Sequence, residues 1–140
     1  FEMGDIKAFL LPPVMEETRK VIITKRAKGP DGKPVPFVLR RIDQETNEKL
    51  IKRAQKQEKI NGQVASVLDN RLFGKLLIEA CVIEPDFKNS ELCAHYKTMN
   101  PLDVPERMLS SGEYARLLAE INNLNGFDEV NEVIEEKAKN

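Results

Sequence analysis

Cysteine, histidine and tryptophan are scarce in this chain of 140 residues, which contains two cysteines, one histidine and no tryptophan. Two cysteines, Cys81 and Cys93, are too few for a disulfide framework, and no second cluster of cysteine and histidine joins His95 to complete a metal site. The calcium-loop pattern and the glycine-rich dinucleotide fingerprint are also missing. We therefore expect no metal and no other cofactor. Cys81 falls in an apolar run and is expected to be a small buried hydrophobic residue.

The chain also lacks an excess of either charge, since it has 22 basic and 23 acidic residues. This balance removes the strongest indication of nucleic-acid binding, which needs a basic surface. No apolar run is long enough to span a membrane, and no secretory signal with an apolar core and a cleavage site is present. We expect neither nucleic acid nor a membrane as a partner, and we expect a cytoplasmic location.

The most apolar stretch covers residues 68–87. Within it, Leu68, Leu72, Leu76 and Ala80 recur every four residues, which is the spacing of one helix face. This pattern predicts a helix that is surrounded by neighbours and that begins near residue 64. Proline cannot continue a helix, so Pro85 is predicted to end it. We expect the rest of the chain to cover this helix.

The first 17 residues form an apolar arm followed by an extended segment, because Phe9, Leu10 and Leu11 precede Pro12-Pro13. Two interpretations remain open. The arm either packs on the body as a short element or binds a partner and becomes ordered on contact.

Residues 18–42 contain two β-branched runs separated by a turn signal at Asp31-Gly32. This arrangement predicts a β-hairpin with a loop of more than two residues. Pro34 and Pro36 are expected to confine the start of the second strand to a sheet edge. The Walker spacing is missing, so a hairpin tip is preferred over a phosphate-binding loop.

Helices are predicted for the remainder of the chain from their capping residues. The first is expected over residues 43–58, with a break at Asn61-Gly62 before the apolar helix. Proline signals near residues 101 and 105 predict a further short helix. The capping signals are Asp43, Ser90, the Ser110–Glu113 capping box and Gly126. Asp128 is expected to cap a last helix that carries Val130, Val133 and Ile134. The expected fold is α+β: a single domain over 1–140, with an arm at 1–17, a hairpin at 18–42 and a mainly helical body at 43–140.

No pattern of residues indicates an enzyme. Cys93 and His95 are two residues apart and point to different sides of a helix, so they are poorly placed to act as nucleophile and base. Glu84, Asp86 and Glu91 cluster near a turn, where acidic residues that cap helix starts are the simpler interpretation. A hydrolase that uses Cys93 or this acidic turn is therefore the weakest of the functional hypotheses.

Several short motifs follow one another in a fixed order along the chain. The first motifs are Phe9-Leu10-Leu11, the segment DGKPVPFVLR at 31–40 and the charged start of the next helix at 42–45. Later motifs are Ala80-Cys81-Val82, Pro85-Asp86-Phe87, Glu91-Leu92, Tyr96, Met108-Leu109, Gly112-Glu113-Tyr114, Leu117-Leu118 and Asn125-Gly126-Phe127. This ordered set resembles the XkdN-like phage tail assembly chaperones over nearly the whole chain, and the segment 55–70 matches least.

This resemblance implies a cytoplasmic protein made with the tail genes of a contractile-tailed phage or a defective prophage. Its implied partner is the tape-measure protein, which it would keep soluble until the tail tube assembles, with the tube protein as a further candidate partner. The family has no catalytic residues to transfer, and the chaperone is not expected in the mature particle. The alternative is a structural tail-completion component that stays in the particle. A homo-oligomer is left open.

Partner binding is placed on the excess of apolar residues near both ends of the chain. The predicted binding residues are Phe9, Leu10, Leu11, Val130, Val133 and Ile134. A second set belongs to the family pattern and is expected to determine the fold, with capping roles for Glu113 and Gly126. These residues are Pro85, Asp86, Phe87, Gly112, Glu113, Tyr114, Gly126 and Phe127.

Overall fold

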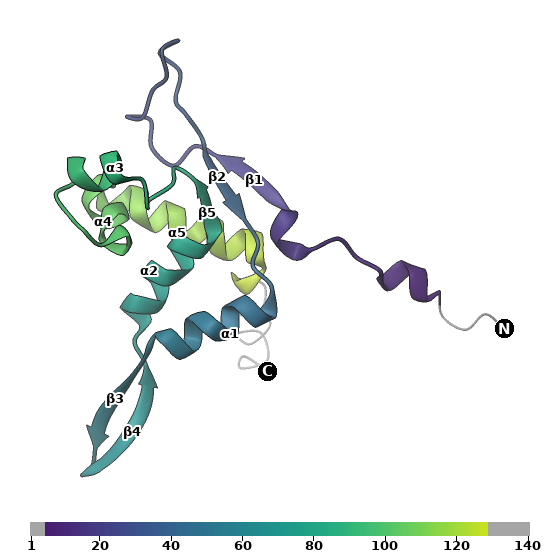
Figure 1. Ribbon diagram of the computed structural model, residues 1–140, viewed down its shortest axis with the longest axis vertical. Helices are drawn as coiled ribbons and strands as arrows, with labels where there is room; N and C mark the ends of the chain where they lie inside the picture. The colour runs from purple at the N-terminus through teal and green to yellow at the C-terminus, as the bar shows by residue number, and fades with distance from the viewer. Residues whose placement is uncertain (1–4, 129–140) are drawn as a thin grey trace, which may run out of the picture.

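The computed structural model describes residues 5–128. A mixed helical and β-stranded body carries two long projections, an N-terminal arm and a two-stranded hairpin (Figure 1). The α+β class is confirmed. The first half of the chain contains η1 (Ile6–Phe9), η2 (Val14–Glu16), β1 (Thr18–Val21), β2 (Phe37–Arg40), α1 (Gln44–Arg53), β3 (Gln55–Ile60) and β4 (Gln63–Leu68). The second half contains α2 (Asn70–Cys81), β5 (Val82–Glu84), α3 (Ser90–His95), η3 (Pro101–Asp103), α4 (Val104–Met108) and α5 (Ser111–Asn125).

Helix α2 is the apolar helix expected from the sequence, and its last turns are buried. Leu76, Leu77, Ile78 and Cys81 belong to the core. The predicted bounds were wrong at both ends. The helix begins only after Asp69, whose side chain accepts a hydrogen bond from the backbone of the first turn. It ends at Cys81 rather than at Pro85, because the next three residues form strand β5.

Strands β1, β2 and β5 form a three-stranded antiparallel sheet with β2 in the centre. The register pairs Thr18 with Arg40 and Val21 with Phe37. The expectation of an edge position for the second strand was wrong. Both prolines lie before the first residue of β2, so they remove no hydrogen bond from the sheet. Strand β5 pairs with the side of β2 that faces away from β1, which places β2 in the centre.

A second β-hairpin, β3–β4, occupies the segment that was predicted to be helical up to residue 58 and again from about residue 64. Its register runs from Gln55 opposite Leu68 to Ile60 opposite Gln63. Asn61 and Gly62 form the connecting turn with φ angles of 54° and 80°. Positive φ at both positions is the requirement of a two-residue hairpin turn, and Asn-Gly is the preferred sequence for it.

Most of the predicted helix caps are confirmed. Asp43 caps α1, Ser110 and Glu113 form a capping box at the start of α5, and Gly126 ends α5 in the left-handed conformation with φ 77°. Helix α3 is capped by Asn89 rather than by Ser90, which is its first helical residue. Phe127 packs against the core.

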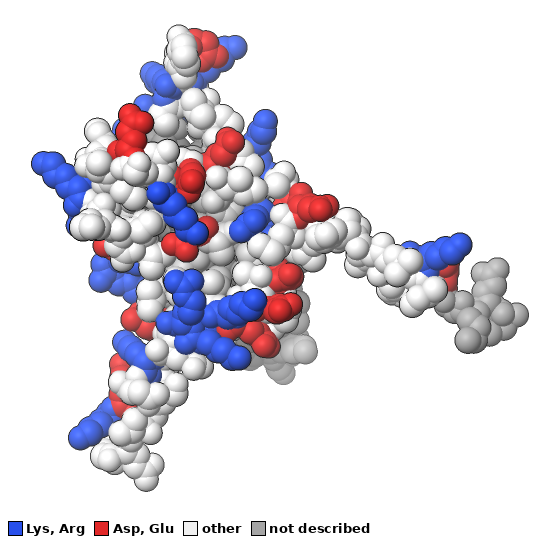
Figure 2. Space-filling model, in the orientation of Figure 1, with Lys and Arg blue, Asp and Glu red and all other residues white. Residues whose placement is uncertain are grey.

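One hydrophobic core joins the sheet to the helices. The largest side chains that are almost completely buried come from the segment after β1 and from β2, α2, α4 and α5, and they include Ile23, Leu39, Leu76, Ile78 and Leu117. Basic and acidic residues are mixed over the visible face, and basic side chains gather over α1 (Figure 2). No helix within residues 5–128 has the length and apolarity that a membrane span needs.

Candidate partner-binding site

The N-terminal arm extends away from the body (Figure 1), and its apolar side chains are exposed to solvent. Phe9, Leu10 and Leu11 are 71%, 74% and 74% exposed, and neither η1 nor η2 contains a buried residue. Figure 2 shows that most of this arm carries no charge. A contiguous apolar segment that is held away from its own core is an unusual use of such residues, and exposed apolar patches of this kind are often interaction sites in proteins. This exposure shows that the apolar end of the arm does not pack on the body. Its role in partner binding stays a prediction.

The arm is attached to the body just before β1. Met15 lies 3.7 Å from the hydroxyl of Thr46, which points its Oγ1 at the methionine sulfur. Arg41 pairs with Glu17 at 2.7 Å. These contacts orient the chain where it leaves the sheet, while the apolar residues further out make no comparable contact among residues 5–128. The arm is therefore an extended segment that is fixed to the body at its C-terminal end and is apolar further out.

The other predicted binding residues, Val130, Val133 and Ile134, lie outside the described residues. Their role in partner binding stays a prediction.

An apolar groove opens where the sheet meets α3 and α4. Its volume is about 480 Å³, and it is lined by Phe37 of β2, Pro85 after β5, Leu92 and Tyr96 from the α3 region, and Met108 of α4. These residues are spread over more than half of the sequence, so no local periodicity points to the groove. The lining is mainly apolar, with the charged residues Arg26 and Glu84 among its members, so it can remove apolar side chains of a partner from water.

The rim of the groove is held by Arg26. Its guanidinium donates to the Glu113 carboxylate, with 2.6 Å between Nη2 and Oε1, and to the carbonyl of Met108 at 2.8 Å. Glu113 also accepts from the backbone N–H of Ser110 at 2.9 Å. Hydrogen bonds from Arg26, Thr24 and this backbone N–H keep the pKa of Glu113 well below its usual range. The ion pair at this rim therefore holds the loop between β1 and β2 against the start of α5.

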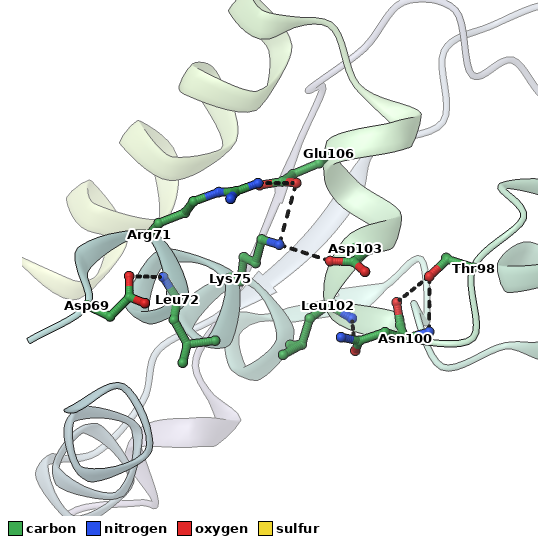
Figure 3. A network of polar contacts seen from close by, with 9 residues as sticks. All are labelled: Asp69, Arg71, Leu72, Lys75, Thr98, Asn100, Leu102, Asp103 and Glu106. Atoms are coloured by element: carbon green, nitrogen blue, oxygen red, sulfur yellow. Dashed lines mark hydrogen bonds and ion pairs between the residues drawn. The ribbon is translucent and has the colours of Figure 1, made fainter. Parts of the chain in front are cut away.

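A second polar network joins α2 to the η3–α4 segment (Figure 3). Lys75 donates to Asp103 at 2.9 Å and lies 3.5 Å from Glu106, which also pairs with Arg71 at 3.3 Å. The hydrogen bond to Asp103 raises the pKa of Lys75, and the same bond lowers the pKa of Asp103. Only 14% of the Lys75 side chain is exposed, and its ammonium lies between the carboxylates of Asp103 and Glu106. The network holds α4, whose Met108 lines the groove, against α2.

Three of the residues considered for catalysis, Cys93, His95 and Asp86, have structural partners. The Cys93 thiol donates to the carbonyl of Phe87 at 3.2 Å, and His95 packs edge-on against Tyr96 with 4.7 Å between ring centroids. Asp86 accepts from the backbone of Lys88 in a turn at 3.0 Å. No cluster of three potential metal ligands occurs within residues 5–128. These contacts are those of side chains that stabilise the local structure.

Cys81 is the small buried hydrophobic residue that the sequence predicts. It is fully inaccessible to solvent, and burial raises the pKa of its thiol to about 11. The thiol is protonated at neutral pH, so it is unsuited to nucleophilic chemistry.

The model of the family described as phage XkdN-like tail assembly chaperone protein matches residues 6–139. The chain belongs to this XkdN-like family. The phage-like element PBSX protein XkdN of Bacillus subtilis (strain 168) is 36% identical over 140 residues, covering 97% of this chain and 94% of that protein. The uncharacterized protein YqbN of the same strain is also 36% identical, with coverage of 97% and 93%. The crystal structure of the protein YqbN superimposes with a TM-score of 0.70 at 28% identity and covers 90% of this chain and 97% of that one.

In this XkdN-like chaperone, several residues of the family pattern have clear structural roles. Phe87 is buried and packs edge-on against Phe37, with ring centroids 6.4 Å apart. Glu113 completes the capping box of α5 and anchors Arg26, and Gly126 supplies the left-handed C-cap. Tyr114 is half-buried against the core, where burial raises its pKa. Pro85 differs from these residues because it lines the apolar groove.

The family gives this chain a role in phage tail assembly and favours a function without catalysis. The exposed arm and the apolar groove are the surfaces that suit such a role. The arm was recognised from its sequence, whereas Arg26, Tyr96 and Met108 come together only in the folded chain.

Proposed function

We propose that this chain binds the tape-measure protein and keeps it soluble in the host cytoplasm until the tail tube assembles around it. The observation that supports the proposal most directly is the apolar end of the arm at Phe9, Leu10 and Leu11, which is exposed and separate from the core. The family supplies the assembly role. Val130, Val133 and Ile134 are proposed to add to the same binding surface from the other end of the chain.

The proposed mechanism is temporary burial of apolar helix faces. A tape-measure protein is long, and apolar faces that wait for the tube to assemble would aggregate. The arm can lie along such a face, and the groove beside Pro85 and Tyr96 can receive an apolar side chain from it. Each contact is small, so several copies act together and each one can be displaced by the tube protein.

Co-expression with the tape-measure protein tests the proposal. We expect several copies of the chain to copurify with one soluble tape-measure protein, and we expect the tape-measure protein to precipitate without them. Replacing both Leu10 and Leu11 by glutamate should remove most of the copurified tape-measure protein, because it places charge where apolar contact is proposed.

The matched control is Met99→Glu, which introduces the same kind of charge at a fully exposed apolar residue elsewhere on the body. It should leave capture unchanged. Equal capture by the arm variant and the control would refute the role of the arm. A tape-measure protein that stays insoluble with the unmodified chain would refute the proposed function itself.

Analysis of purified particles by mass spectrometry tests the proposed location. A chaperone that is displaced by the tube should be absent from finished particles. Its presence there in a fixed ratio to the tube protein would instead support a structural tail-completion component.

A further inference from the structure

Strand β4 presents an unpaired edge that is exposed to solvent. The β3–β4 sheet has two strands, and no third strand within residues 5–128 pairs with it. The hairpin projects from the body beyond α1 and α2 (Figure 1). Val64 is 66% exposed and Leu68 is 38% exposed, although both are apolar. An isolated two-stranded hairpin is marginally stable in water, so this one gains from a further strand.

The hydrogen-bond register defines which groups face outward on β4. The backbone N–H of Asp69 donates to the carbonyl of Ala54 at 2.8 Å, immediately below the pair formed by Gln55 and Leu68. Bonded and non-bonded pairs alternate along an antiparallel ladder. The pairs that contain Leu68, Ser66 and Val64 are therefore non-bonded, and the N–H and C=O groups of these three residues point away from β3.

Charge distinguishes this edge from the other strand edges of the chain. Strand β4 reads QVASVL and contains no charged residue, whereas β3 reads QKQEKI and contains three. The edge strand β1 has only four residues, and two of them are Arg19 and Lys20. Charged side chains and short length are the usual protection of a strand edge against pairing, and β4 has neither.

The sequence of β4 is complementary to itself. Two copies related by a twofold axis through Ser66 place each Ser66 opposite the other, and each Val64 opposite the Leu68 of the second copy. The outward backbone groups of all three residues then form the new ladder, and the apolar side chains pair across it on one face. On the opposite face, Ala65 of one copy lies next to Val67 of the other. No pair of like charges is created.

We propose that this edge is the dimer interface of the chain: β4 of one copy pairs antiparallel with β4 of a second copy, giving a four-stranded sheet in the order β3–β4–β4–β3. The interface is isologous, because the same surface is used by both copies. The new ladder is short, so the dimer dissociates on dilution. This proposal does not depend on tape-measure binding.

Sedimentation velocity of the full chain over a range of about 5 to 500 µM tests the proposal. The weight-average mass should rise from that of the 15.9 kDa monomer towards twice this value. Ser66→Pro removes one outward N–H and no bond to β3, and it should abolish the rise. Gln57→Pro is the matched control, because it makes the same change on the outer edge of β3, opposite Ser66.

A second pair of variants tests the interface without proline. Ser66→Lys places two ammonium groups opposite each other at the twofold axis, so it should weaken dimerisation at least tenfold and should respond to salt. Gln57→Lys adds the same charge at the cross-strand position and should dimerise as the unmodified chain does. Far-UV circular dichroism and urea unfolding should show that all four variants remain folded.

The outcomes of these experiments distinguish a dimer paired through β4 from a dimer that forms through another surface. A chain that stays monomeric at the highest concentration overturns the proposal. A dimer that survives both Ser66 variants, or that is lost equally in the Gln57 controls, also overturns it and moves the contact elsewhere. Slower amide exchange at Val64, Ser66 and Leu68 with rising concentration, and unchanged exchange at Gln55, Gln57 and Lys59, is the result expected from pairing at β4.

Discussion

The exposure of the arm predicts a sharp difference between two leucine-to-alanine substitutions. Leu76 in α2 is 2% exposed, so Leu76→Ala removes three buried carbon atoms, worth about 2.4 kcal/mol, and leaves a cavity. The total loss in the free energy of unfolding should be about 2–5 kcal/mol. Leu10 is 74% exposed and buries only a quarter of its surface. Leu10→Ala should therefore cost no more than about 0.8 kcal/mol.

Urea unfolding followed by circular dichroism measures both values under the same conditions. Because the chemical change is identical, the difference between the variants reports burial alone. A cost above about 1.5 kcal/mol for Leu10→Ala would show that the arm packs on the body, and it would remove the structural basis of the proposed tape-measure contact. A cost below about 1 kcal/mol for Leu76→Ala would show that α2 is not the centre of the core.

Two further predictions concern polar contacts inside the body. Asn125 accepts a hydrogen bond from the backbone N–H of Ile42 at 3.0 Å and donates one to the carbonyl of Ile121 at 2.9 Å. In urea titrations, Asn125→Ala should lower the free energy of unfolding by about 1–3 kcal/mol. An unchanged free energy of unfolding would show that water replaces the amide. The lowered pKa of Asp103 means that its contribution to stability is present above pH 4 and is lost as the pH falls through the lower folded value. Lys75→Gln should therefore reduce the loss of stability between neutral pH and pH 3, and identical pH profiles for the two chains would contradict this.

Local signals predicted the starts of α1 and α5 and the end of α5. Asp43, Ser110, Glu113 and Gly126 act through hydrogen bonds or backbone conformations within a few residues of the helix terminus, so their roles can be read directly from a short segment. The apolar spacing of α2 was also recognisable, because burial on one face depends on periodicity alone. The alternation of charge in residues 55–60 was less informative, since it suits both an exposed helix and an exposed strand.

The sequence contained a clear signal for the β3–β4 hairpin, which was misinterpreted. Asn61-Gly62 was interpreted as a break between two helices, although two residues of this type between short runs are the strongest local sign of a hairpin. The short strand β5 carried no such signal. Its pairing with β2 is set by contacts between residues more than forty positions apart.

The groove could not be predicted for a related reason. Arg26, Phe37, Pro85, Tyr96 and Met108 reach it from five separate parts of the fold. None of them lies on a periodic face that points to the others. Their assembly depends on the Arg26–Glu113 ion pair and on the packing of α3 and α4, which only the folded chain reveals.

The hydrogen bond from Asp69 to the carbonyl of Ala54 has a practical consequence for engineering this protein. It brings the two ends of the β3–β4 hairpin to a single point, and neither strand contributes a fully buried side chain to the core. The tip at Asn61-Gly62 can therefore accept an inserted affinity tag without disturbing the core. In the proposed dimer, a bulky insertion there would lie against the base of the second hairpin and block the pairing of β4. A short tag would label the molecule far from its arm and its groove, so capture of a partner could be followed without a fusion at either terminus.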